Sequence, residues 1–141
     1  MARTVGYMLT WRTYGTWLPE EGLGVYRKQQ MREAAVCLDA RARGLVRDAV
    51  MREAKRWGEG IEALAVTSEH VHVVVRYSEP PIDEFVEACK AAGQAALERA
   101  GYNGRVWAKG YDKRFCFDED ALRTRVEYVE GHAKGGGRER V

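Results

Sequence analysis

The sequence predicts an α/β fold of the α+β sandwich type, an antiparallel β-sheet with helices on one face, as in ferredoxin-like and RRM-like domains. Two observations predict it. Segments with the apolar alternation of strands and segments with helical periodicity follow one another in the order β-α-β-β-α-β-α. The two central strands are separated by a tight polar turn, which indicates an antiparallel hairpin. Two helices on one face of such a sheet leave the other face available for a ligand.

The first half of this order has clear local signals. Residues 4–12 are rich in β-branched and aromatic side chains, which favours a strand. Glycines and a proline in residues 13–24 exclude a regular element there, and loops of this length are often functional. Asp39 is a good N-cap and Gly58 a good terminator for a helix over residues 40–57.

The second half follows the same logic. The runs IEALAVTS and HVHVVVRY, residues 61–68 and 70–77, are the two strands of the hairpin. Two prolines close the second strand and open a helix over residues 82–100. Residues 105–117 form a short extended region, an edge strand or hairpin. An aspartate cap and an acidic first turn begin a last helix over residues 118–134.

Length and composition indicate one soluble domain, residues 1–134, followed by a flexible basic tail, residues 135–141. Of the 141 residues, 45% are hydrophobic and 31% charged, which is ordinary for a folded protein. The sequence has neither an apolar run of membrane-spanning length nor a secretory signal, so we expect a cytoplasmic, nucleoid-associated protein and no membrane partner. The net charge of +2 is too small to indicate nucleic-acid binding by itself.

The three cysteines are widely spaced and odd in number. This is neither a disulfide framework nor a CxxC metal pattern. We therefore expect Cys37, Cys89 and Cys116 to be reduced thiols that fill core space.

Two of the three histidines lie side by side in the second hairpin strand, in the sequence EHVHVVV. Because side chains alternate along a strand, Val71, Val73 and Val75 share one face, and His70 and His72 share the other. The valine face belongs against the helices, so both imidazoles are expected on the open face, about 7 Å apart along the strand. Such a pair can bind a metal ion. Two exposed histidines without a role fit the same pattern, and a metal site would need a third ligand.

The last helix offers further groups. Its apolar stripe contains Leu122, Val126 and Val129, and Tyr128 and His132 fall one turn apart on a neighbouring face. Both side chains thus project in one direction from a helix that could lie beside the sheet. An alternative is that the tyrosine is a solvated rim residue and the histidine a favourable charge at the helix C-terminus.

These motifs together resemble a known family, the single-tyrosine HUH transposases of bacterial insertion sequences, which include the REP-associated tyrosine transposases. The resemblance covers most of the chain. LTWRTYGTWLP resembles the opening strand and loop of the family, and ALAVTSEHVHVVV its histidine strand pair. VWAKGYDKRF, followed by RVEYVEGH, resembles the stretch that leads into the tyrosine helix. The GTWLP and WxKGYxxRF segments are more distinctive than the histidine pair.

The resemblance implies cleavage and rejoining of single-stranded DNA, which is often next to a hairpin. It makes Tyr128 the nucleophile and His70 and His72 ligands of a divalent metal, Mg²⁺ or Mn²⁺. Relatives often have glutamine or asparagine one turn after the tyrosine; His132 stands there and would complete the metal site, which leaves the identity of the metal open. Relatives also commonly have proline and asparagine where this chain has TSEH. The family includes homodimers with shared sites as well as monomers.

The DNA-binding residues would combine stacking with cationic contacts, as single-strand binding requires. The candidates lie in or near the motif segments, apart from Arg76 on the histidine face, and each aromatic has core packing as its alternative. They are Arg12, Tyr14, Trp17, Arg76, Trp107, Lys109, Lys113 and Arg114.

Two other functions remain open on the sequence. A catalytically silent nucleic-acid-binding module of the same fold would bind DNA without cutting it, although the aromatic signature of RRM domains is not evident in the central strands. A small zinc hydrolase could use His70, His72 and His132 around an activated water. The second of these leaves Tyr128 without a role and the motif segments unexplained.

Overall fold

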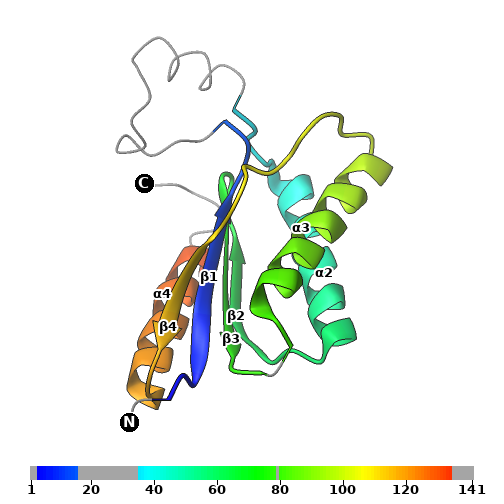
Figure 1. Cartoon of the computed structure of the whole chain (residues 1–141). Helices are drawn as coiled ribbons and strands as arrows, with labels where there is room; N and C mark the ends of the chain where they lie inside the picture. The colour runs from blue at the N-terminus through cyan, green and yellow to red at the C-terminus, as the bar shows by residue number, and fades with distance from the viewer. Residues whose placement is uncertain (1–2, 16–34, 79, 135–141) are drawn as a thin grey trace, which may run out of the picture.

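The computed structural model describes residues 3–15, 35–78 and 80–134 of the chain (Figure 1). In chain order, the elements in these residues are β1 (Gly6–Arg12), α2 (Ala40–Trp57), β2 (Ile61–Val66), β3 (His70–Arg76), α3 (Ile82–Arg99), β4 (Asp112–Cys116) and α4 (Glu119–Lys134). This is the order that the sequence predicts. The expected basic tail, residues 135–141, lies outside the described residues.

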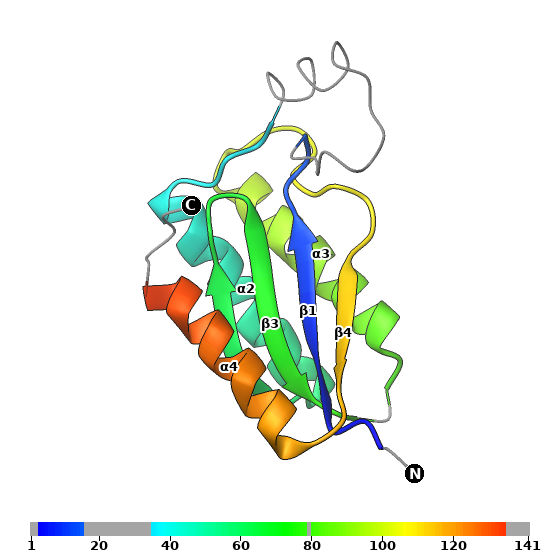
Figure 2. The ribbon, with the colours of Figure 1, turned by 90° about the vertical axis from the view of Figure 1, so that its left-hand side faces the viewer.

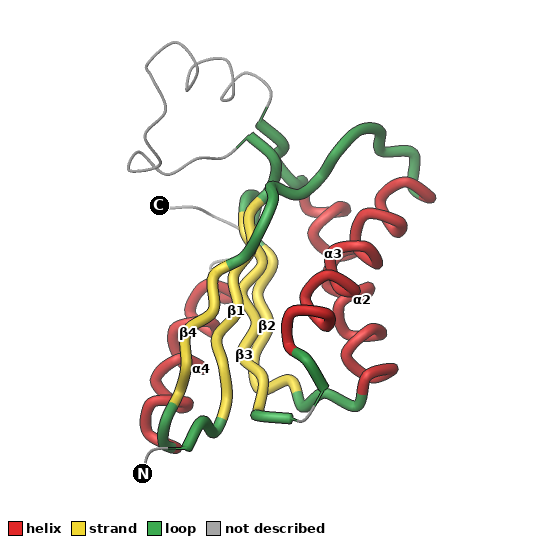
Figure 3. The backbone as a smooth tube through the Cα atoms, viewed as in Figure 1, coloured by secondary structure: helices red, strands yellow, loops and turns green. Residues whose placement is uncertain are grey.

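The strands form one antiparallel sheet in the order β2-β3-β1-β4. β1 lies between β3 and β4, so β2 and β4 are the two edges of this sheet. Helices α2 and α3 lie together on one side of it, as Figure 3 shows. The predicted α+β fold class is confirmed: the antiparallel sheet has the ferredoxin-like strand order, and α2 and α3 pack on one of its faces.

The helix boundaries follow from their capping residues. The carboxylate of Asp39 accepts a hydrogen bond from the backbone N–H of Ala42, at 2.8 Å, and so caps α2. Gly58 ends that helix in the left-handed region, at φ 71°, and its N–H bonds back to the last turn. Asp118 caps α4 in the same way through the N–H of Ala121, at 2.7 Å. Among the described residues, every helix is too short or too polar to serve as a bilayer-spanning segment.

The main core lies between the sheet and helices α2 and α3. Val71, Val73 and Val75 of β3 are fully buried there, together with Phe85 of α3 and Val46 of α2. The alternation of β3 therefore orients the strand as the sequence predicts. With its valine face covered, the histidine face of β3 points to the other side of the sheet.

The last helix, α4, packs on that other side, chiefly over β2 and β3 (Figure 2). Leu122 and Val129 are buried there against Met8, Val74 and other apolar side chains of the sheet. We expected this second face to be uncovered. It is covered in part, because the alternate residues of β1, β2 and β3 are apolar on this side as well and the stripe of α4 needs an apolar surface.

The three cysteines have different surroundings. Cys89 and Cys116 are buried in the two apolar clusters, as the sequence predicts. Cys37 is exposed, and its Sγ lies 4.0 Å from a carboxylate oxygen of Glu69. The expectation that all three fill core space is wrong for Cys37, because the segment that precedes α2 runs along the surface beside the β2–β3 turn.

Close packing between β1 and α4 depends on Gly6. A Cβ at this position would lie 2.5 Å from the carbonyl oxygen of Val75 and 2.7 Å from a methyl carbon of Leu122. Gly6→Ala is therefore expected to lower the free energy of unfolding by about 1–3 kcal/mol, the usual cost of overpacking. Urea denaturation followed by circular dichroism measures this difference.

Gly44 provides a matched control on an exposed turn of α2. An added Cβ there meets nothing within 4 Å. Gly44→Ala should raise the free energy of unfolding by about 0.5–1 kcal/mol, because alanine loses less backbone entropy than glycine in a helix. If both substitutions changed stability in the same direction, Gly6 would not have the packing role assigned to it.

Candidate active site

The two histidines of β3 face the side of the sheet on which α4 lies. Their rings stack with centres 5.5 Å apart and planes 21° apart. His72 is 7% exposed, and His70 is half-buried. The prediction that both imidazoles share one face of the strand is confirmed by their common position in one groove with Tyr128.

Thr10 of β1 orients the His72 ring. The two residues are directly paired in the β1–β3 register, and Thr10 Oγ1 lies 3.1 Å from His72 Nδ1. Either atom can be the donor, depending on the tautomer of the imidazole. A metal contact by His72 would therefore go through Nε2, with Nδ1–H donating to the threonine hydroxyl. A hydrogen bond of this kind is the usual support for a metal-binding histidine.

Tyr128 and His132 of α4 come down beside this pair in the same chain. The centre of the His72 ring lies 6.0 Å from that of Tyr128 and 4.9 Å from that of His132. The ring centres of Tyr128 and His132 are 4.4 Å apart. Nδ1 of His132 lies 3.0 Å from the backbone carbonyl oxygen of Tyr128, one helical turn earlier. The Tyr128 side chain is 48% exposed. The structure thus brings an accessible phenol next to the buried imidazole within one subunit.

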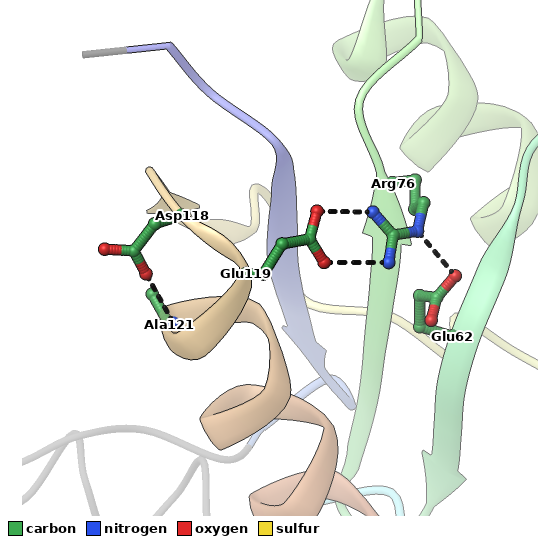
Figure 4. Close-up of polar contacts among 5 residues, drawn as sticks. All are labelled: Glu62, Arg76, Asp118, Glu119 and Ala121. Atoms are coloured by element: carbon green, nitrogen blue, oxygen red, sulfur yellow. Dashed lines mark hydrogen bonds and ion pairs between the residues drawn. The ribbon is translucent and has the colours of Figure 1, made fainter.

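An ion-pair clamp fixes the N-terminal end of α4 on the sheet (Figure 4). The guanidinium of Arg76 makes two hydrogen bonds of 3.0 Å to the carboxylate of Glu119 and one of 3.1 Å to Glu62 of β2. The bond to Glu119 is the main reason that the pKa of Arg76 is raised. Arg76 ends β3, about 20 Å along the strand from His70. The predicted DNA contact is therefore placed away from the histidines and is held by two carboxylates.

A groove of about 660 Å³ runs along this face and contains half of the candidate residues. It is lined by both β3 histidines, by Tyr128 and by three cations predicted to contact DNA: Arg12, Lys109 and Arg114. Arg114 is paired with Asp112 at 2.9 Å on the exposed surface of β4. The groove thus offers positive charge beside the accessible phenol of Tyr128, which suits an anionic ligand.

Trp107 lies in the core. It is 6% exposed, its ring meets Trp11 edge-on at 6.3 Å, and its Nε1–H donates to the carbonyl oxygen of Lys90, at 2.8 Å. A side chain so enclosed has little surface to offer a nucleic acid. The sequence left two interpretations open for Trp107, contact with DNA and packing in the core. In the structure Trp107 packs in the core.

The other predicted DNA contacts are dispersed. Lys113 points to the opposite side of β4 from the groove, where its amino group lies over the rings of Tyr7 and Phe115. Tyr14 is half-buried beneath the guanidinium of Arg105, which lies 4.6 Å from its ring centre. Trp17 lies outside the described residues.

Lys90 of α3 supports the groove, although the sequence analysis did not identify it. It is 8% exposed, and its Nζ donates to the carbonyl oxygens of Ala108 and Gly110, both at 3.0 Å. Burial lowers the pKa of Lys90 below that of an exposed lysine. These bonds hold the backbone on either side of Lys109. A lysine on the apolar stripe of an amphipathic helix is the signal that could have revealed it.

The three histidines form a donor set that suits a divalent transition metal. A metal-bound imidazole has its ring centre about 3 Å from the ion, so two rings that share an ion have centres at most about 6 Å apart. The spacings of His72 from His70 and from His132, 5.5 and 4.9 Å, meet this limit. In the part of the chain that the structure describes, no three His, Cys, Asp or Glu side chains converge as a metal site. The donors fit such an ion in type and proximity, and side-chain rotation would be needed for all three to reach it.

Comparison with known proteins gives structural relatives. A scan against protein-family models finds no match, and neither does a search of curated protein sequences. A transposase candidate of Deinococcus radiodurans R1 is similar with a TM-score of 0.56 and 24% identity, over 94% of this chain and 93% of that one. The chain has the same fold. A REP-associated tyrosine transposase, solved bound to a REP hairpin, is similar with a TM-score of 0.57 and 13% identity, over 95% of this chain and 73% of that one. The expected resemblance to such transposases therefore extends to the fold of almost the whole chain.

Proposed function

We propose that this protein is a metal-dependent single-stranded DNA endonuclease and transesterase of the transposase type, which acts beside DNA hairpins. The observation that carries the proposal is the position of Tyr128. Its accessible phenol lies next to His72 and His132 in a groove lined by cations. The fold shared with two transposase structures supports the same conclusion. The structure of the REP-associated tyrosine transposase contains a REP hairpin, which supports a hairpin-bearing substrate for this chain as well.

The proposed reaction begins when Tyr128 Oη attacks a phosphorus atom of the DNA strand. A P–O bond to tyrosine forms, the bond to the 3′ oxygen breaks, and the products are a free 3′ hydroxyl and a 5′-phosphotyrosine. A 3′ hydroxyl then attacks the same phosphorus and the phenolate leaves. Phenols leave more readily than sugar hydroxyls because their pKa is near 10. The covalent intermediate keeps the energy of the broken phosphodiester bond, so rejoining needs no ATP.

The protein side chains supply position and charge. Arg12, Lys109 and Arg114 would hold the phosphates along the groove. His70, His72 and His132 would hold the divalent metal, Mg²⁺ or Mn²⁺, and their imidazole donors suit the transition metal of the two better. When bound, it would neutralise the phosphate and stabilise the departing oxygen. Thr10 would keep the His72 ring in one orientation. Because all of these groups belong to one chain, we propose that a single subunit can carry out cleavage.

The test is the formation of a covalent protein–DNA adduct. Purified protein is incubated with Mn²⁺ and a panel of 5′- and 3′-labelled stem-loop DNAs with single-stranded flanks. The proposal predicts a denaturant-resistant adduct on the 3′-labelled fragment, with phosphotyrosine at Tyr128 by peptide mass spectrometry. Binding without an adduct across the panel would instead favour a catalytically silent DNA-binding module of this fold.

A second prediction concerns the groove cations. Lys109→Gln is expected to weaken single-strand binding and to reduce the slope of log K against log salt by about 0.7, the value for one phosphate contact. Fluorescence anisotropy between low and moderate salt measures this slope. Lys55→Gln is the matched control, because Lys55 is exposed near the end of α2 and does not line the groove. Equal slopes for the two variants would show that Lys109 does not contact a DNA phosphate.

A further inference from the structure

Exposed aromatic side chains gather on the side of β4 that faces away from the groove. We call Tyr7, Tyr77, Phe115 and Phe117 the aromatic cluster. Phe115 and Phe117 have nearly parallel rings, 14° apart with centres at 5.9 Å, and Tyr7 lies 5.6 Å from Phe115 and 6.2 Å from Tyr77. Tyr77, Phe115 and Phe117 are 53%, 48% and 54% exposed. Contiguous exposed apolar surface of this kind commonly marks a binding site.

A cation accompanies the rings. The amino group of Lys113 lies 5.7 Å from the centre of Tyr7 and 5.4 Å from that of Phe115. Two carboxylates on this side are already hydrogen-bonded: Asp83 accepts from the Tyr111 hydroxyl, and Glu59 from the Ser78 hydroxyl. Planar apolar surfaces next to an ammonium group match an unpaired base and its phosphate.

The cluster and the groove are joined through the edge strand of the sheet. β4 has β1 on one side and no further strand of this sheet on the other. Its alternate residues point to opposite faces: Asp112 and Arg114 line the groove, whereas Lys113 and Phe115 meet Tyr7 on the α3 side. A DNA strand that leaves the groove over this edge of the sheet passes from Arg114 to Lys113 and then reaches the rings.

We propose that the aromatic cluster binds unpaired bases of the same DNA strand whose scissile phosphate lies in the groove, with the strand passing over the β4 edge. This inference rests on the proposed function and extends its DNA contacts to the second face of the sheet. It also gives Lys113 a phosphate to bind outside the groove. Stacking on rings tolerates any base, so this part of the site is non-selective.

The experiment measures affinity for 5′-fluorescein-labelled oligo(dT) of graded length by anisotropy, in the Tyr128→Phe background so that no adduct can form. Phe115→Ala combined with Phe117→Ala is expected to weaken binding of the longer oligonucleotides about tenfold or more. Oligonucleotides too short to pass the edge should bind as before. Phe115→Tyr with Phe117→Tyr should retain full affinity, because it keeps the rings.

Met51→Ala is the matched control, because Met51 is 42% exposed on α2, away from β4. Equal affinities of the alanine pair and this control at every length would overturn the inference. The inference would also be overturned if the wild-type protein were a dimer in analytical ultracentrifugation and the alanine pair a monomer, because the cluster would then be a contact between copies.

The adduct assay separates the two proposals. With Tyr128 intact, the alanine pair should still form the adduct at saturating DNA, whereas failure of the wild-type protein to form any adduct counts against the proposed function alone.

Discussion

Replacement of Tyr128 by phenylalanine is expected to abolish the covalent protein–DNA adduct while leaving DNA affinity nearly unchanged. The substitution removes the attacking oxygen and keeps the ring, which lies 6.0 Å from His72 and 4.4 Å from His132. Loss of a nucleophile typically costs more than about a thousandfold in rate. Adduct formation on the cleaved stem-loop is quantified on denaturing gels, and affinity by anisotropy with the same DNA.

Tyr111→Phe is the matched control for this experiment. Tyr111 lines the same groove, but its hydroxyl donates to the carboxylate of Asp83 on α3. Burial and that hydrogen bond raise the pKa of Tyr111, and both disfavour its use as a nucleophile. We expect this variant to form the adduct. Adduct formation by Tyr128→Phe together with its loss in Tyr111→Phe would transfer the role of nucleophile to Tyr111.

The part of the site on β3 could be predicted from the sequence because strand geometry is local. Side chains alternate along any strand, so the valines at 71, 73 and 75 assign the histidines to the opposite face wherever the strand packs. The helix caps at Asp39 and Asp118 are equally local, since each bonds to a backbone N–H three residues later. These predictions required no knowledge of which elements meet in space.

The placement of α4 could not be predicted in this way. Its stripe shows that Leu122 and Val129 are buried, and leaves open which face of the sheet they bury against. The contacts that decide this are distant in sequence: the fit of Leu122 against Gly6, and the pairing of Glu119 with Arg76. The sequence predicts a phosphate contact for Arg76, because a cation on the histidine face has no partner visible in the sequence alone.

The same limit applies to the segment before β4. The motif WxKGYxxRF identifies the segment but does not indicate which side chains are buried. In the structure Trp107 faces the core and Lys109 the groove, because Lys90 binds the carbonyl oxygens on both sides of Lys109. A buried lysine can bind these carbonyls only after α3 and the segment have come together. Tertiary contacts therefore divided the predicted DNA contacts into core and surface residues.

Removal of both β3 imidazoles, by His70→Ala with His72→Ala, is expected to abolish metal-dependent cleavage and to weaken binding of Mn²⁺ below detection. The reason is that two of the three proposed ligands are lost, and His132 alone offers a single donor. Isothermal titration with Mn²⁺ measures the metal directly, without DNA. The adduct assay with Mn²⁺ or Mg²⁺ measures the reaction. Because His72 is 7% exposed, the free energy of unfolding must be measured alongside.

Thr10→Val separates loss of the metal from loss of the fold. Valine has nearly the shape of threonine but cannot hydrogen-bond to His72 Nδ1, which lies 3.1 Å from the threonine hydroxyl. If His72 binds the metal through Nε2, the loss of this hydrogen bond should weaken Mn²⁺ binding by about 10–100-fold. A higher concentration of Mn²⁺ should then restore cleavage. A variant without both histidines that still binds Mn²⁺ and cleaves DNA would show that the metal, if any, is held elsewhere. Unchanged Mn²⁺ affinity in Thr10→Val would show that His72 does not bind it in the orientation that the β1–β3 pairing imposes.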